Sequence, residues 1–78
     1  MRPLSWRQFQ AARLIGKGLN NREIAEKMGI PYVAVKSVVY EVLLKTGARD
    51  RVQLGIWMNC ELFLSGLPVV SPKDKEPL

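Results

Sequence analysis

The sequence predicts an all-α fold, and three features of the chain lead to that prediction. Apolar residues recur along most of it at the spacing of amphipathic helices. Residues suited to helix N-caps precede these stretches, and glycine or proline follows them. The segment at 20–47, NNREIAEKMGIPYVAVKSVVYEVLLKTG, has the pattern of a short helix, a tight turn and a longer helix. That pattern is typical of a helix-turn-helix, so we expect a domain of four helices at residues 5–66.

The composition limits the classes of function. The chain has 78 residues and a net charge of +5, which favours a polyanionic partner such as nucleic acid or an anionic membrane. It has no histidine and one cysteine, which excludes a histidine-dependent triad, an internal disulfide and a multi-thiolate metal site. We therefore expect no enzyme, no metal and no cofactor. No apolar run approaches the ~18 residues of a membrane span, so we expect a cytoplasmic protein without a membrane partner.

The first helix is expected at 6–16, after a short lead-in at 1–4. Ser5 is its predicted N-cap, and Gln8 stands three residues later, which completes the capping-box pattern S-x-x-Q. Gly18 suits the left-handed residue that ends a helix.

The second helix is expected at 21–28, with Asn20 or Asn21 as its cap. Gly29 suits the left-handed residue of the following turn because glycine has no Cβ. Ile30, directly after it, is expected to fill the core behind the turn.

The third helix opens at Pro31, which is tolerated in a first helical turn, and extends to Lys45 before the stop at Gly47. Its apolar residues at i, i+3, i+4, i+7 and i+8 predict a buried stripe of Val35, Val38, Val39, Val42 and Leu43. The opposite face carries Tyr32, Val33, Lys36, Ser37 and Tyr40.

A fourth helix is expected at 51–65, capped by Asp50 and ended by Gly66. It is apolar around much of its circumference, so one face must cover the other helices and a second face remains as an interaction surface. Cys60 lies within this helix and is expected to be a small buried residue. The proline-rich, charged segment at 67–78 is expected to be a disordered tail.

Several strings in the chain have a recognisable order and spacing. LSWRQFQAARLIGKGLNNREIAEKMGI, then VKSVV, then LLKTGARDRVQL resemble the LuxR/GerE-type DNA-binding domain over residues 4–57. The resemblance implies a four-helix domain whose third helix reads the DNA major groove and whose fourth helix forms a two-fold dimer contact. It also implies that Lys36, in the position of the lysine of the family's T-V-K motif, contacts DNA.

The resemblance places other residues at the DNA as well. Ser37 and Tyr40 occupy neighbouring groove-facing positions, and Tyr32 and Val33 lie on the same face. Arg22, Arg49 and Arg51 fall near phosphate-contacting parts of the family. Asn20 and Asn21, at the start of the second helix, are expected to present backbone and amide donors to a phosphate. The chain departs from the pattern at Val33, where polar residues are common, and a valine there can pack on a thymine methyl group.

Two functions remain open from the sequence. One is a transcriptional regulator that binds double-stranded DNA as a homodimer through its fourth helix, with a contact formed by Trp57, Cys60, Phe63 and Leu64. The other is a protein-interaction module that uses the same scaffold to bind RNA polymerase or another regulator. The low number of hydrogen-bond donors on the third helix favours the second reading, and the net positive charge favours the first.

Overall fold

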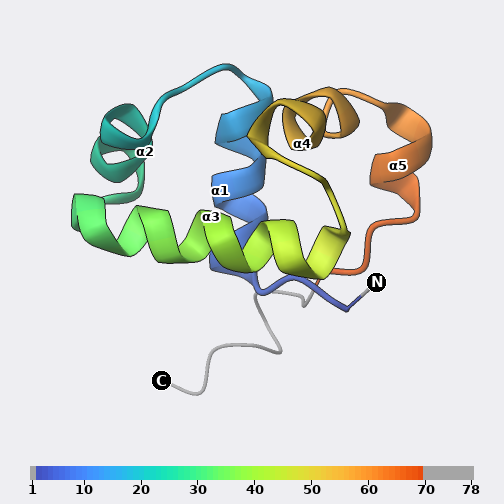
Figure 1. Ribbon diagram of the computed structural model, residues 1–78, viewed down its shortest axis with the longest axis horizontal. Helices are drawn as coiled ribbons and strands as arrows, with labels where there is room; N and C mark the ends of the chain where they lie inside the picture. The colour runs from blue at the N-terminus through green and yellow to red at the C-terminus, as the bar shows by residue number, and fades with distance from the viewer. Residues whose placement is uncertain (1, 70–78) are drawn as a thin grey trace.

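The computed structural model describes residues 2–69, which form an all-α helix-turn-helix domain (Figure 1). The helices within this range are α1 (Trp6–Gly16), α2 (Asn21–Met28), α3 (Tyr32–Thr46), α4 (Arg51–Trp57) and α5 (Glu61–Ser65). The predicted all-α fold class is confirmed, and the helix count of the described part is five instead of four. None of these helices is long and apolar enough to cross a membrane.

Side-chain caps fix where the first two helices begin. The Ser5 hydroxyl accepts a hydrogen bond from the Gln8 backbone N–H at 3.1 Å, and the Gln8 side chain accepts one from the Ser5 N–H at 2.9 Å. Asn20 and Glu23 form the same reciprocal pair at the start of α2, with both distances 2.9 Å. The capping box predicted at Ser5 is confirmed, and of the two candidate caps for α2 the structure selects Asn20.

The turn between α2 and α3 sets the angle between these two helices. Gly29 adopts a left-handed backbone with φ of 66°, as predicted, and Ile30 packs against the core. Figure 1 shows α3 crossing one end of α1, with α2 on one side of α1 and α4 on the other. The inward face of α3 is the predicted stripe, in which the four valines are buried and Leu43 is partly buried.

The prediction of a single helix at 51–65 is wrong, because α4 ends at Trp57 and α5 begins at Glu61. We call the three residues between them the break after α4. Cys60 has an extended backbone, and the Asn59 side-chain amide donates to the carbonyl oxygens of Gly55 at 2.9 Å and Gly16 at 2.8 Å. Met58 is buried so close to α1 that a Cβ on Gly16 would lie 2.9 Å from the Met58 Cβ. The side-chain amide therefore holds the break against the end of α1.

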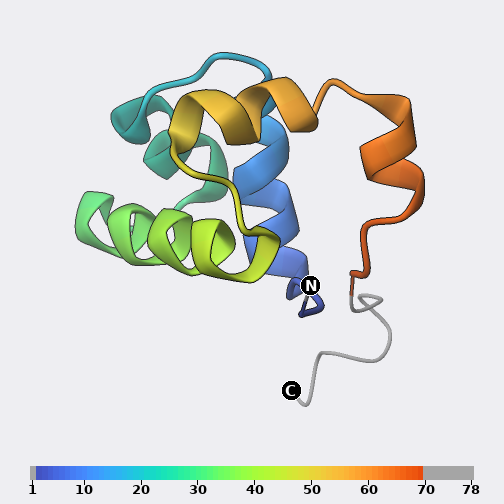
Figure 2. The same cartoon turned by 45° about the vertical axis from the view of Figure 1, so that its right-hand side comes forward.

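Because of the break, the second half of the expected helix, now α5, packs against the core of the domain. Figure 2 shows α5 turning down from the end of α4 towards the N-terminal side. Phe63, Leu67 and Val69 pack against the core, and Leu4, fully buried, donates its backbone N–H to the Pro68 carbonyl at 2.9 Å. A continuous helix would carry these apolar groups away from the core, so burial favours the break.

The folded part reaches beyond the domain limits expected from the sequence. Leu4, placed in the lead-in, belongs to the core, and residues 67–69 lie against it instead of starting a tail. The rest of the expected tail, 70–78, lies outside the described residues.

Candidate nucleic-acid interface

The outward face of α3 is built from the residues that the helical period placed opposite the buried stripe. All of them are exposed, namely Tyr32, Val33, Lys36, Ser37 and Tyr40. Leu44, four residues after Tyr40, extends this face and is also exposed. Leu44 is absent from the face expected from the sequence, although the i, i+4, i+7, i+11 spacing from Val33 places it there.

Lys36 lies close to the first turn of α3. Its ammonium nitrogen is 6.0 Å from the centroid of the Tyr32 ring, which is within reach of a weak cation–π contact at an exposed site. Helical side chains lean towards the helix N-terminus, and the contact with Tyr32 reinforces that direction. The positive charge of the outward face is thus placed at the end of α3 nearest α2.

Four of the predicted site residues come together at the start of α2. Asn20, Asn21 and Arg22 line a shallow hollow of about 240 Å³ with Tyr32 from α3. The N-terminus of a helix carries partial positive charge, and Arg22 adds a full one. The Asn20 backbone N–H is already used by Glu23, so Asn20 offers its side-chain amide to a ligand and not its main chain. This arrangement suits an anionic oxygen such as that of a phosphate.

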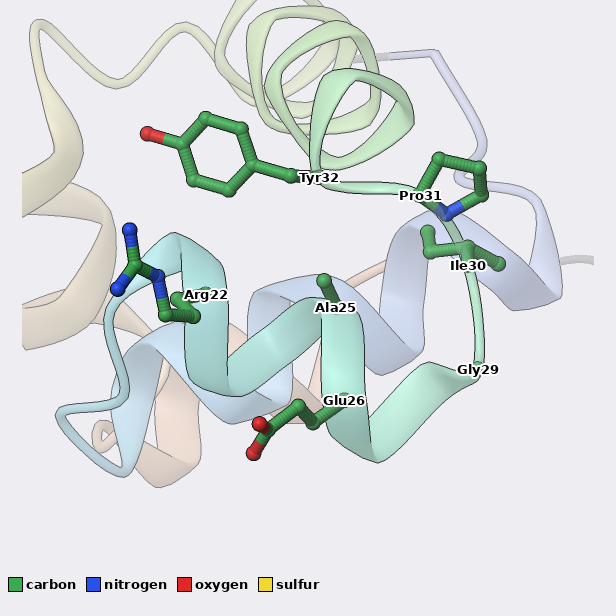
Figure 3. A pocket seen from close by; sticks show the side chains of 7 residues that line it. All are labelled: Arg22, Ala25, Glu26, Gly29, Ile30, Pro31 and Tyr32. Carbon is green, nitrogen blue, oxygen red and sulfur yellow. The ribbon is translucent and has the colours of Figure 1, made fainter.

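A larger open hollow of about 700 Å³ lies beside the first, between α2 and the start of α3. Figure 3 shows Arg22 and Tyr32 at one end of it and Ile30 and Pro31 at the other, with Ala25 between them. Because Ala25 is small, the surface stays hollow where α2 and α3 meet.

Arg51 differs from the other predicted arginines because its guanidinium group bonds to residues distant in the chain. It donates to the Leu19 carbonyl at 2.8 Å and to the Asn21 side-chain oxygen. These bonds tie the start of α4 to the loop before α2. The structure therefore gives Arg51 a part in positioning the N-terminus of α2, while Arg22 is exposed.

Arg49 lies in the loop between α3 and α4, paired with a neighbouring carboxylate. Its Nε donates to Asp50 at 3.3 Å, and both side chains are more than half exposed. Asp50 also accepts a hydrogen bond from the Gln53 backbone N–H at 2.9 Å, as the predicted N-cap of α4. The hydrogen bond from Gln53 first, and the Arg49 side chain second, lower the pKa of Asp50 below its ordinary value of 3.8.

This lowered pKa predicts an acid-sensitive contribution to stability. A carboxyl group with a depressed folded-state pKa stabilises the fold above its unfolded pKa, and the contribution is lost as pH falls through the folded pKa. An NMR titration of the Asp50 carboxyl carbon should give a midpoint below 3.8. Asp50→Asn keeps an oxygen acceptor for the cap and removes the titration, so its melting temperature should fall less than that of the wild type between pH 5 and pH 3. A midpoint at or above 3.8 would contradict the assignment.

One carboxylate on α3 is drawn away from the outward face. Glu41 accepts a hydrogen bond from the Gln8 side-chain amide at 2.9 Å, and the Lys45 ammonium donates to the Gln8 side-chain oxygen at 2.8 Å. This cluster could not be found from the sequence, because Gln8 is more than thirty residues from both Glu41 and Lys45. Within residues 2–69, no group of three or more His, Cys, Asp or Glu side chains is placed to hold a metal ion.

The residues expected at a dimer contact are divided by the break after α4. Trp57 and Phe63 are half-buried and pack on one another, with ring centroids 5.2 Å apart. Cys60 and Leu64 are exposed, so the expectation that Cys60 is a small buried residue is wrong. The most exposed apolar side chains of α4 are instead Val52 and Ile56, with 72% and 65% of their surface accessible.

Comparisons with known proteins identify one family over most of the chain. Residues 2–58 match the GerE family, described as bacterial regulatory proteins of the luxR family. The chain is 41% identical over 54 residues to the transcriptional regulatory protein LnrK of Bacillus subtilis (strain 168). That match covers 69% of this chain and 24% of the relative, so the chain spans about a quarter of that protein's length. No solved structure matches the chain significantly.

Proposed function

Since the chain belongs to the luxR family of bacterial regulatory proteins, we propose that it is a DNA-binding transcription regulator that acts by binding and not by catalysis. In this proposal α3 enters the major groove of duplex DNA, and the start of α2 contacts the adjacent phosphates. The net charge of +5 supplies attraction to the duplex.

The observation that carries the proposal is the position of the exposed face of α3 beside the hollow at the start of α2. A helix of this length is about 22 Å long at 1.5 Å per residue, enough to cross a major groove about 12 Å wide. Lys36 and Ser37 then lie towards the bases, Arg22 and the α2 N-terminus lie towards one backbone, and Arg49 lies towards the phosphates from the α3–α4 loop. Tyr40 is placed to stack on a sugar or to donate to a phosphate.

Titration of the isotope-labelled chain with mixed duplex DNA at low salt tests this function. Backbone NMR signals of α3 and of residues 20–22 should shift, while those of Arg13 and Lys17, which are not among the proposed contact residues, should not. Binding measured by fluorescence anisotropy should weaken steeply as salt is added, because phosphate contacts release counterions. Signals on α3 that stay unchanged at high DNA concentration would refute the proposal.

We further propose that two copies pair through the outer face of α4. Val52 and Ile56 are four residues apart and therefore lie on one side of the helix. Cys60 and Leu64 are exposed beyond the end of α4, and Trp57 with Phe63 supports that face from within the chain. Two α3 helices in such a pair would enter successive major grooves about 34 Å apart.

A charged residue on that face should prevent pairing. Ile56→Asp is expected to give a monomer by sedimentation at concentrations at which the wild type is dimeric, because an unpaired carboxylate would be buried in the contact. Leu62→Asp is the matched control, since Leu62 on α5 is 85% exposed and lies outside the proposed face. A wild type that remains monomeric on a two-half-site duplex would contradict the dimer.

One observation favours the alternative of a protein-interaction module. Val33, Tyr40 and Leu44 form an exposed apolar stripe along α3, which an RNA polymerase subunit or another regulator can cover. In that case mixed duplex DNA leaves α3 unaffected, and a pull-down with purified RNA polymerase is weakened by Tyr40→Ala.

A further inference from the structure

We infer that Val33 and Lys36 together read a thymine methyl group next to a guanine, so that the recognised half-site carries these two bases within about two base steps. This inference rests on the proposed function, because it requires α3 to lie in the major groove. It assigns Val33 as a specificity-determining residue and names the chemical groups that the site reads.

Val33 is placed for base contact and has no part in the core. It lies in the first turn of α3, and 71% of its surface is exposed. The N-terminal residues of a recognition helix are those that reach base edges. The only methyl group that the base pairs present in the major groove is the thymine C5-methyl. A valine has two methyl groups and a stiff χ1, so it buries that methyl at little entropic cost.

The hydrogen-bonding groups of α3 favour some bases over others. Its sequence, YVAVKSVVYEVLLKT, contains no asparagine or glutamine, the side chains that pair with adenine through two hydrogen bonds. Its carboxylate, Glu41, accepts a hydrogen bond from the Gln8 side-chain amide at 2.9 Å, and this bond competes with a contact to a cytosine amino group. Lys36 carries donors only, and these match the O6 and N7 acceptors of guanine.

The two contacts must fall close together on the duplex. The Lys36 ammonium lies over the Tyr32 ring, 6.0 Å from its centroid, which places it beside the turn that also carries Val33. Residues three apart on a helix have Cβ atoms about 5–6 Å apart, and base pairs are spaced about 3.4 Å along the duplex axis. A methyl bound by Val33 and a guanine bound by Lys36 are therefore about one or two base steps apart.

The test begins with selection of duplexes from a random pool by the 78-residue chain, followed by replacement of single thymines with deoxyuridine. Deoxyuridine removes only the methyl group and keeps the hydrogen bonds. At one thymine beside a guanine in each half-site, this change should weaken wild-type binding about fourfold, the expected effect of one buried methyl group. Deoxyuridine at the other thymines of a half-site should have no effect.

Variants identify the side chain that contacts the methyl. Val33→Ala should bind the thymine duplex about fourfold more weakly than the wild type and should lose nothing more with deoxyuridine. Leu62→Ala, a change at an exposed apolar residue of α5, should keep the full wild-type sensitivity. Selected duplexes that tolerate deoxyuridine at every thymine, or a Val33→Ala protein as sensitive as the wild type, would overturn this inference alone. Failure to bind any duplex would overturn the proposed function together with it.

Discussion

Lys36→Ala should weaken binding to a selected duplex by about 5- to 150-fold, which corresponds to the ~1–3 kcal/mol expected for a side chain that reads a base. Lys36 is the lysine of the outward face of α3, and its ammonium is directed to the helix end that meets α2. The loss should be largest for the selected duplex and smaller for mixed DNA, because a base contact discriminates while a phosphate contact does not.

The salt dependence of the same variant separates the two kinds of contact. If Lys36 contacts a base, the slope of log K against log salt stays close to that of the wild type, whereas loss of a phosphate contact reduces it by about one. Lys17→Ala is the matched control, since it removes one positive charge from an exposed residue at the end of α1, on the surface lined by Arg13 and Lys27. Equal losses in the two variants would show that Lys36 acts only through net charge.

Leu54→Ala should remove most of the stability of the domain. Leu54 is fully buried in α4, and truncation of a buried leucine costs about 2–5 kcal/mol in lost burial and cavity formation. A chain of this size rarely has more than about 3–5 kcal/mol of stability from its core. We expect the variant to be largely unfolded at 37 °C, as measured by far-UV circular dichroism during urea and thermal denaturation.

Val52→Ala is the control for that experiment because it lies on the same helix with 72% of its surface exposed. Its effect on the free energy of unfolding of the monomer should stay within about 0.5 kcal/mol. Binding to a DNA duplex stabilises the folded state by mass action, so a saturating duplex should partly restore the melting temperature of Leu54→Ala. Similar destabilisation by both changes would mean that α4 is not anchored through Leu54.

The first three helices were predictable because their signals are local. Ser5 with Gln8 caps α1 three residues apart, and Gly29 and Gly47 supply the left-handed stops that end α2 and α3. The valine stripe of α3 follows one helical period, and that period also placed Lys36 and Val33 on the outward face. Each of these features depends on residues less than a few turns apart, which is the range over which a sequence pattern can be read.

The later elements were decided by partners distant in the chain. The break after α4 depends on the Asn59 amide reaching Gly16 and on Met58 packing against α1, more than forty residues away. The apolar residues at 57–65 are compatible with one long helix or with two short ones. The choice between the two depends on which part of the core the other helices leave uncovered, because Phe63 after the break packs there.

The sequence by itself determined the all-α helix-turn-helix, the buried face of α3 and hence the side chains that α3 presents outward. Tertiary structure alone decided that Arg51 is tied to Leu19 and Asn21, that Glu41 is held by Gln8, and that Val52 and Ile56 form the open face of α4. The physical reason is that periodicity fixes the direction of a side chain about its own helix axis. The hydrogen-bond partners of that side chain depend on how helices that are distant in the chain pack together. The same packing decides whether a second apolar face of a helix, such as that of α4, is covered.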